Sequence, residues 1–421
     1  STDSRGNPEY REFEGGIGVR VAGISRGYDQ FLTGDVRAAS ARAADTSTRA
    51  DWSARIETAL GTRDNGVSAG LTDFLGSAEL LAAAPSNRPL RAGFLAAAHD
   101  LAASFRETAA RLEAIDSGVA GSLQQTLTGI NNALVSLEDI NRQLAATPEG
   151  TSASTVLLDR RDAALDELSA DIPIRTELLP QGRVRVRLDT PAGEELVAPG
   201  NRSALALGDP GANGLPTLLI DANFSPRAIA VPDGARVGGL FGALADVRTA
   251  SANIDTLAVD AATVLNDQHQ LGADLSGAPG QPLFSDRSGG ALASAADMIA
   301  VDLSPEDVAT ADALLPDGIT PTPAGYEDNR NLMALSTLAE TLAPRIADFR
   351  GDAAIATASA RDRADIADLS RGDAEAARAN ALGVNLDEEA ADLIRYQQSY
   401  DAAARIIATA RDTFDTLLNL R

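Results

Sequence analysis

The chain has 421 residues, 44% of them hydrophobic but only 4% aromatic, so its core must come mainly from Ala, Leu, Val and Ile, which suit slender helical bundles. Its net charge of −24 argues against nucleic acid or an anionic membrane as the main partner, because phosphate groups attract cationic surfaces. All 36 basic residues are Arg and Cys is absent, which excludes lysine and thiol catalysis, a Walker A motif, disulfides and thiolate metal sites.

The first predicted unit is an extended entry segment, residues 1–26. In it Ile17, Val19 and Val21 alternate with small or polar residues, which is typical of a β-strand. Residues 27–171 are predicted to form the N-terminal part of a helical rod. No apolar run in the chain reaches the length needed to span a bilayer.

The clearest periodic signal of the rod lies between residues 101 and 137. Its apolar positions follow steps of four and three, with one extra step of four, which is typical of a coiled-coil seam with a stutter. The pattern predicts one helix of about 50 residues, far longer than usual in globular proteins. The seam positions are Leu101, Phe105, Thr108, Leu112, Ile115, Val119, Leu123, Leu127, Ile130, Leu134 and Leu137.

The period then changes to two. Val184, Val186 and Leu188 alternate with arginines, and Pro and Gly punctuate the region, so residues 172–233 are predicted to form a small inserted β domain. Four further units are expected: 234–270 as a helix returning to the rod, 271–330 as a second irregular insertion, 331–382 as the C-terminal part of the rod, and 383–421 as a last helix.

The predicted fold class is therefore α+β, mainly α. We expect an elongated helical bundle or coiled-coil rod built from both chain ends, with the small β domain and the irregular insertion projecting from it.

The last helix has a well-formed predicted start and an apolar stripe. Asn385 can cap it, and Glu388 can complete a capping box. The stripe from Leu386 to Leu418 keeps a four–three rhythm and is apolar enough to require a partner helix. Its polar members, Gln397 and Arg411, suggest that register or assembly is specified at some cost in stability.

Two glycine motifs could be mistaken for catalytic loops. The run 66–70 matches the G-x-S-x-G nucleophile elbow, but a helix precedes Ser68 where the elbow requires a strand, so we interpret it as a loop with Ser68 as a helix cap. The run 15–18 lacks the full spacing of a phosphate loop and any Lys, and a glycine-rich strand entry fits it better.

The titratable residues also favour structural interpretations. His269 has no second His nearby, and a His at a helix end more often packs or caps than binds metal; His99 has no ligand partner either. Asp159, Asp162 and Glu167 alternate with arginines, which is typical of a solvated, ion-paired helix face. We therefore expect no catalytic, cofactor-binding or metal-binding residues, and no enzyme.

Several blocks resemble one family. The run 383–400 is similar to the C-terminal motif shared by hook, rod and junction proteins of bacterial flagella. Internal blocks resemble, more specifically, the hook–filament junction family, also called the hook-associated protein 1 family. These blocks are Gly18-Val19-Arg20-Val21, the run from Gly66 to Phe74, Leu157-Leu158-Asp159-Arg160-Arg161-Asp162, and Gly238-Gly239-Leu240 through Phe284.

The resemblance implies a structural adaptor, secreted to the extracellular flagellum and needed for filament assembly. Its implied partners are the hook protein, the second junction protein, further copies of itself in a ring-like heterologous assembly, and a cytosolic export chaperone that holds the C-terminal helix. The implied assembly and chaperone interface is the last helix, through Leu386, Leu393, Tyr400, Ile407, Phe414 and Leu418.

The family normally opens with an N-terminal helical segment that pairs with the C-terminal helix, and this chain begins near or after that segment. We therefore expect the helix from Leu386 to Leu420 to be mobile in a monomer.

Two alternatives stay open. The first is another flagellar axial protein, a second junction protein or flagellin-like subunit, which usually lacks a block like 238–284. The second is a secreted adhesin or hydrolase, for which clustered aromatics or a convergent polar site would be expected in 172–233.

Overall fold

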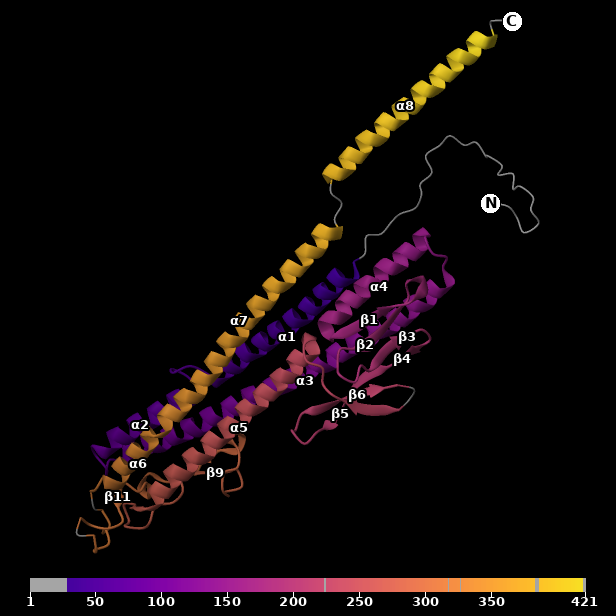
Figure 1. Cartoon of the computed structure of the whole chain (residues 1–421). Coiled ribbons are helices and arrows are strands. Elements are labelled where there is room, and N and C mark those ends of the chain that lie inside the picture. The colour runs from indigo at the N-terminus through magenta and orange to yellow at the C-terminus, as the bar shows by residue number, and fades with distance from the viewer. Residues whose placement is uncertain (1–28, 223–224, 317, 326, 383–385, 419–421) are drawn as a thin grey trace.

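The structure is a computed structural model that describes residues 29–222, 225–316, 318–325, 327–382 and 386–418. These residues form a long, narrow rod of helices with small antiparallel sheets along one side and at one end (Figure 1). The predicted fold class is confirmed. The helices are α1 (Gln30–Leu60), α2 (Val67–Ala82), α3 (Arg88–Ala146), α4 (Ser152–Asp171), α5 (Ala235–Gln270), α6 (Arg330–Glu340), α7 (Leu342–Leu382) and α8 (Leu386–Leu418). The strand expected at residues 17–21 lies outside the described residues.

Helix α1 begins where the sequence supplies a cap and then packs against α7 and α5. The Asp29 carboxylate accepts hydrogen bonds from the backbone N–H groups of Phe31 and Leu32, at 2.8 and 3.0 Å. Along the contact with α7, the Thr357 hydroxyl donates to the Ser53 carbonyl at 3.1 Å. Helices from the two parts of the chain are therefore neighbours in the rod.

The predicted seam lies on α3, which has 59 residues. All its positions are buried except Ile115, which is partly buried. The seam does not face one partner helix throughout: α3 packs on α2 near its start, then on α5, and on α4 near its end. The expectation of a coiled-coil seam is corrected to the core of a multi-helix bundle, because successive parts of the stripe meet different elements.

Strands between residues 174 and 229 form two antiparallel sheets, ordered β1-β2-β3-β4 and β5-β6-β7. The alternation seen in the sequence lies on β2, where Val184, Val186 and Leu188 are fully buried. The strands are β1 (Ile174–Leu178), β2 (Val184–Leu188), β3 (Glu195–Ala198), β4 (Asn201–Arg202), β5 (Ala204–Pro210), β6 (Pro216–Asp221) and β7 (Pro226–Ile229).

Two asparagines of α3 attach these sheets to the rod. The Asn141 side chain donates to the carbonyl of Val184 and accepts from its N–H, both at 2.8 Å, and Asn131 forms the same pair with Leu205 at 2.8 Å. The inner residues of the strands share one hydrophobic core with the helices. The sheets therefore lie along the rod, which corrects the expectation that this insertion projects from it.

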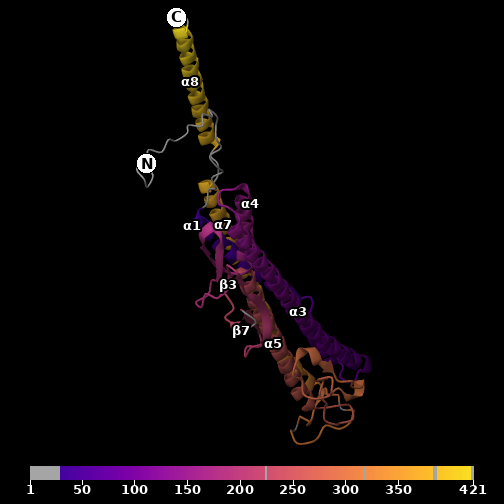
Figure 2. The same cartoon turned by 90° about the vertical axis from the view of Figure 1, so that its right-hand side faces the viewer.

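The region 271–330 contains two short strand pairs, β8 (Gly272–Ala273) with β11 (Ala311–Asp312) and β9 (Phe284–Ser285) with β10 (Ile299–Ala300). It is held by buried polar groups of the rod. The guanidinium of Arg91, 1% exposed, donates to the carbonyl of Val308 at 2.7 Å and to the Thr310 hydroxyl at 2.9 Å. This region forms the end of the rod opposite to α8 (Figure 2).

Candidate assembly surface

Helix α8 extends beyond the rod in both views (Figures 1 and 2). Every α8 residue whose burial the structure describes is exposed. Four predicted interface side chains lie in the open: Leu393, Tyr400, Ile407 and Phe414 are 58%, 72%, 46% and 66% exposed. They are seven residues apart, which is two helical turns, so they share one face of the helix.

The predicted ends of this stripe are less fully described. Leu386 and Leu418 are the first and last residues of α8 as the structure describes it, but the burial of their side chains lies outside the description. The predicted cap Asn385 and the side chain of Glu388 lie outside it as well.

The exposed stripe has a clear energetic consequence. Burying one large apolar side chain stabilises a protein by about 1.5–3 kcal/mol, and helices in proteins gain most of their stability from packing an apolar face. The four exposed side chains of α8 do not make that gain within the rod. This face is therefore the part of the described chain best suited to contact another helix.

Ion pairs link three helices at the end of the rod nearest to α8. Asp166 of α4 accepts from Arg37 of α1 at 2.7 Å and from Arg378 of α7 at 3.3 Å. Next to it, Arg161 contacts Asp162 at 2.7 Å, and both residues are buried. Arg161 and Asp162 form a buried pair within α4, and removing one partner would leave an uncompensated charge. The pairs of Asp166 link α4 to α1 and α7, but Asp166 and Arg378 are partly exposed, so these pairs contribute less.

This cluster corrects one expectation. Asp159 and Glu167 are exposed, as a solvated face requires, but Asp162 faces the interior with Arg161. The alternation of charges along the sequence does not reveal this, because the partners that cover Arg161 and Asp162, Gly182 and Arg37 of α1, are distant in sequence.

The other candidate residues of the sequence have structural positions. Gly66 is the cap of α2 and adopts a φ of 70°, whereas Ser68 lies inside the first turn, so the expectation that Ser68 caps the helix is wrong. Helix α1 precedes this turn, and no nucleophile elbow forms. His99 is exposed on α3. The run 15–18 lies outside the described residues.

His269 is fully buried at the end of α5, where its ring hydrogen-bonds to the backbone of the region 271–330. Its Nε2 accepts from the N–H of Ala309 at 2.9 Å, so Nδ1 carries the proton and donates to the carbonyl of Gln281 at 2.5 Å. Burial lowers the pKa of His269 to about 4, which keeps the ring neutral. Among the described residues no cluster of three or more potential metal ligands occurs, and none of their helices is long and apolar enough to cross a membrane.

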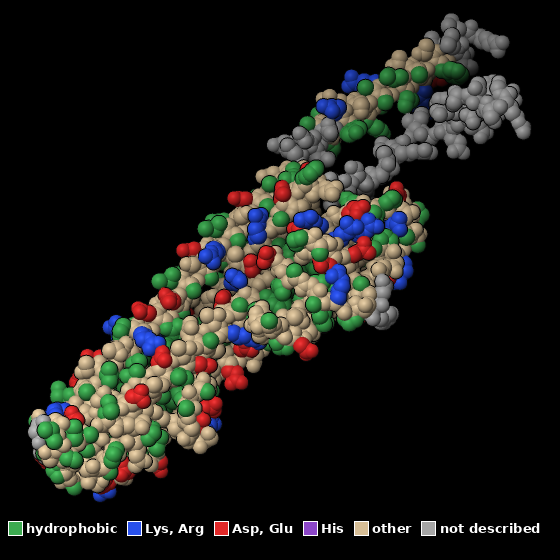
Figure 3. Space-filling view, turned by 60° about the horizontal axis from the view of Figure 1, so that its bottom comes forward, with side chains coloured by type: hydrophobic (Ala, Val, Ile, Leu, Met, Phe, Trp, Pro, Cys, Tyr) green, Lys and Arg blue, Asp and Glu red, His purple; other side chains and the backbone are tan. Residues whose placement is uncertain are grey.

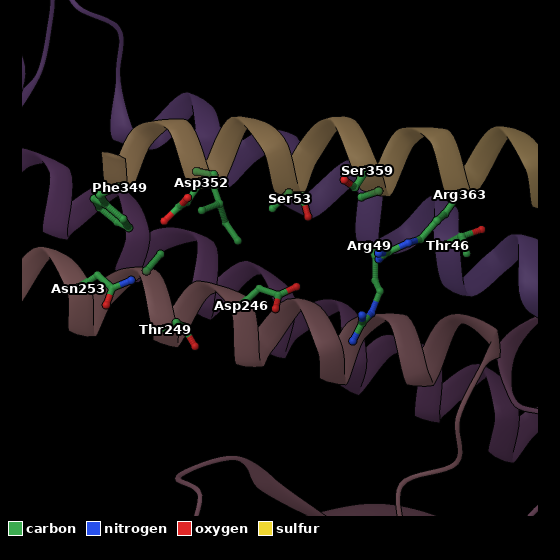
Figure 4. Close-up of a pocket in the computed structure, with 15 residues that line it drawn as sticks. Thr46, Arg49, Ser53, Asp246, Thr249, Asn253, Phe349, Asp352, Ser359 and Arg363 are labelled. Atoms are coloured by element: carbon green, nitrogen blue, oxygen red, sulfur yellow. The ribbon is translucent and has the colours of Figure 1, made fainter. Parts of the chain in front are cut away.

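A groove of about 440 Å³ lies between α1, α5 and α7. Arg49 extends into it from α1, between Asp246 of α5 and the side chains of Ser359 and Arg363 on α7 (Figure 4). Burial raises the pKa of Asp246, and Arg49 partly offsets the shift. The lining hydroxyls of Thr46 and Thr249 donate to carbonyls of their own helices at 3.0 and 2.9 Å. These hydroxyls are thus occupied, and the geometry is that of an imperfectly filled helix contact.

The surface carries its charge in a mixed pattern. On the face shown in Figure 3, arginines lie among acidic side chains along the rod. Exposed ion pairs on the described surface include Arg88 with Glu306 at 3.0 Å and Arg175 with Asp189 at 2.6 Å. Exposed pairs each contribute little, so the distinctive surface feature remains the apolar face of α8.

A family model for the helical domain of the flagellar hook-associated protein FlgK matches residues 53–284, more than half of the chain. The chain belongs to the FlgK family. The match includes the block 238–284, so the alternative of another axial protein is not supported. A second model, for the C-terminal region of the flagellar basal body rod proteins FlgEFG, matches residues 379–420, which contain α8.

Curated relatives support the same family over nearly the whole chain. The flagellar hook-associated protein 1 of Escherichia coli (strain K12) is 23% identical and that of Salmonella typhimurium 24% identical, each over 96% of this chain and 90% of its own length. The Bacillus subtilis (strain 168) protein of the same name is 22% identical over 98% of this chain and 88% of its own length.

A solved structure, the flagellar hook junction protein FlgK from Burkholderia pseudomallei, shows the same fold. It covers 80% of this chain and 98% of its own chain with a TM-score of 0.65, at 16% identity. The resemblance found in the sequence is thereby confirmed, and the FlgK-family chain is a structural protein of the bacterial flagellum.

Some residues important to the structure carried no recognisable signal in the sequence. Asn131 and Asn141 look like ordinary polar positions of a long helix, yet they support both sheets. A signal existed only in their positions beside the apolar stripe of α3, where a polar side chain must find a partner once it is buried.

Proposed function

We propose that this chain is a non-enzymatic adaptor at the junction between flagellar hook and filament, and that α8 is its main assembly element. The observation that carries the proposal is the exposed stripe of Leu393, Tyr400, Ile407 and Phe414, on a helix that the axial-protein family model matches. An apolar face of this length gains stability only against another protein surface.

The partners we propose are the hook protein, the second junction protein and further copies of this chain. An axial subunit needs heterologous, head-to-tail contacts, because these build rings or open helical assemblies where isologous contacts close into dimers. A rod with an assembly helix at one end presents different surfaces to the subunits before and after it, which suits such contacts.

Before assembly, a cytosolic export chaperone covers the same face of α8 in this proposal. A free apolar helix of this kind would otherwise associate prematurely. A helix that packs only on incorporation loses its conformational entropy at that step, which delays polymerisation until the correct site is reached. The protein then acts outside the cell, in the extracellular flagellum, where the absence of Cys avoids unwanted oxidation.

A deletion strain tests the role of the whole chain. We expect hooks without attached filaments and flagellin released into the medium, seen by electron microscopy and by analysis of the culture supernatant. Normal motility of that strain would overturn the assignment.

A matched pair of variants tests the role of α8. In the deletion strain, I407D/F414D should fail to restore swimming, because two carboxylates enter the apolar stripe. A402D/T409D adds the same charge on the opposite face of the same exposed helix and should restore it. Equal swimming with both variants would contradict the assignment of the stripe.

A further inference from the structure

Strand β1 has a free edge. It is the terminal strand of the sheet β1-β2-β3-β4, with β2 as its neighbour among the described residues. The carbonyl of Pro173 accepts from the N–H of Asp189 at 3.0 Å, and the N–H of Leu179 donates to the carbonyl of Arg183 at 2.8 Å. Alternate residues of an antiparallel strand direct their backbone groups to opposite sides, so the odd-numbered residues of β1 serve β2.

The even-numbered residues, Ile174, Thr176 and Leu178, direct their N–H and C=O groups away from β2. Their partners across the ladder behave consistently. Val184, opposite Leu178, exchanges both of its backbone hydrogen bonds with Asn141 of α3. In the described part of the chain, the outer groups of β1 have no hydrogen-bond partner. Such a row of open groups is a template for another strand.

A groove of about 600 Å³ runs between this edge and helix α1. Ile174 and Thr176 line it from β1, and Gln30 and Gly34 line it from α1. A Cβ atom at Gly34 would meet no atom within 4 Å, so this wall of the groove is open. Gln30 is the first residue of α1, so the chain that precedes the helix leaves it at the groove.

We propose that residues 17–22 of this chain pair with the free edge of β1 and fill the groove. Ile17, Val19 and Val21 alternate with Gly18, Arg20 and Ala22, so one side of such a strand is apolar and the other is small or polar. Residues 23–29 provide the connection to α1. Seven residues reach up to about 24 Å at 3.4 Å each, which is sufficient to return from α1 to the strand edge.

Pairing at this edge has a structural consequence for assembly. The ion pairs of Asp166 with Arg37 and Arg378 place the start of α1 beside the end of α7, just before α8. The groove therefore lies near the end of the rod from which α8 extends, and so would the strand that pairs there.

Residue-resolved amide hydrogen exchange on the full chain tests the pairing. The outward amides of Thr176 and Leu178 should exchange slowly, although they face away from β2. In G18P/V19P they should exchange at least about tenfold faster, because adjacent residues point their N–H groups to opposite sides and one of the two prolines removes a ladder bond in either register. The control variant D3P/S4P, outside the segment, should leave them slow.

The amides of Arg175 and Glu177 serve as an internal reference, since they face β2 in either case. The proposal predicts that G18P/V19P leaves them unchanged. Fast exchange of Thr176 and Leu178 in the parent chain would overturn it. So would slow exchange that ignores the prolines, or an equal acceleration of all four amides.

Discussion

Helices α3 and α8 carry the same four–three pattern of apolar residues, but the stripe of α3 is buried and that of α8 is exposed. On α3, Leu127 and Leu134 are fully buried by other helices of the same chain, whereas on α8 Tyr400 and Phe414 are mostly exposed. The pattern specifies that a helix needs a partner but not whether that partner belongs to the same molecule. Neighbouring elements decide this, and among the described residues no element of the rod covers Leu393, Tyr400, Ile407 or Phe414 of α8.

The largest expected effect compares the two stripes directly. Leu127→Ala should lower the free energy of unfolding by about 3–4 kcal/mol, because it leaves a cavity in a closely packed core. Ile407→Ala removes a similar side chain from the exposed stripe and should change it by less than about 0.5 kcal/mol. Urea denaturation of the purified chain measures both. Similar losses in the two variants would show that α8 packs within the monomer.

The second test concerns the pH dependence of stability that buried His269 produces. Because burial lowers the pKa of His269 to about 4, the unfolded state binds more protons than the folded state between about pH 6.5 and 4. His269 is neutral in both states above this window, so stability is unaffected there. It falls by about 3 kcal/mol as the pH drops from 6.5 to 4. Arg91 and Asp274 act on the ring with opposite signs, and both effects are smaller than that of burial.

Other groups also titrate in this range, so a variant isolates the contribution of His269. The free energy of unfolding of the parent and of His269→Gln should be measured at pH 7 and pH 4. We expect the advantage of the parent to shrink by about 3 kcal/mol between the two pH values. A difference that does not change with pH would show that the ring is not kept neutral by burial.

Many helices and strands of this molecule could be predicted from the sequence, because local patterns of residues determine them. The long apolar stripe of α3 and the alternation of β2 follow from periodicity. What it missed depends on distant partners. Asp162 looks solvated until α1 covers it, and Asn141 looks unremarkable until β2 needs a hydrogen-bonding neighbour. The apolar stripe of α8 was visible as a pattern, but only the structure shows its exposure.

The third test asks whether the sheet β1-β2-β3-β4 is stabilised by its contact with α3. Asn141→Ala leaves the N–H and C=O of Val184 buried without their partners and should cost about 2 kcal/mol. Asn201→Ala changes an exposed asparagine at the edge of the same sheet and is expected to be nearly neutral. Thermal unfolding compares the two variants. A neutral Asn141→Ala would mean that the sheet does not depend on α3.

The smallest effect is expected for the exposed stripe of α8. L393A/F414A should leave the unfolding transition of the isolated protein within about 0.5 kcal/mol of the parent, because these side chains are already exposed. In the same protein, amides of α8 should exchange quickly and those of α3 slowly, since only α3 is fixed by packing. In the presence of a protein that binds α8, L393A/F414A should weaken binding, and amide exchange along α8 of the parent should slow. Strong protection of α8 in the isolated protein would instead mean that its stripe is already covered, and that the contrast between the two stripes does not hold in solution.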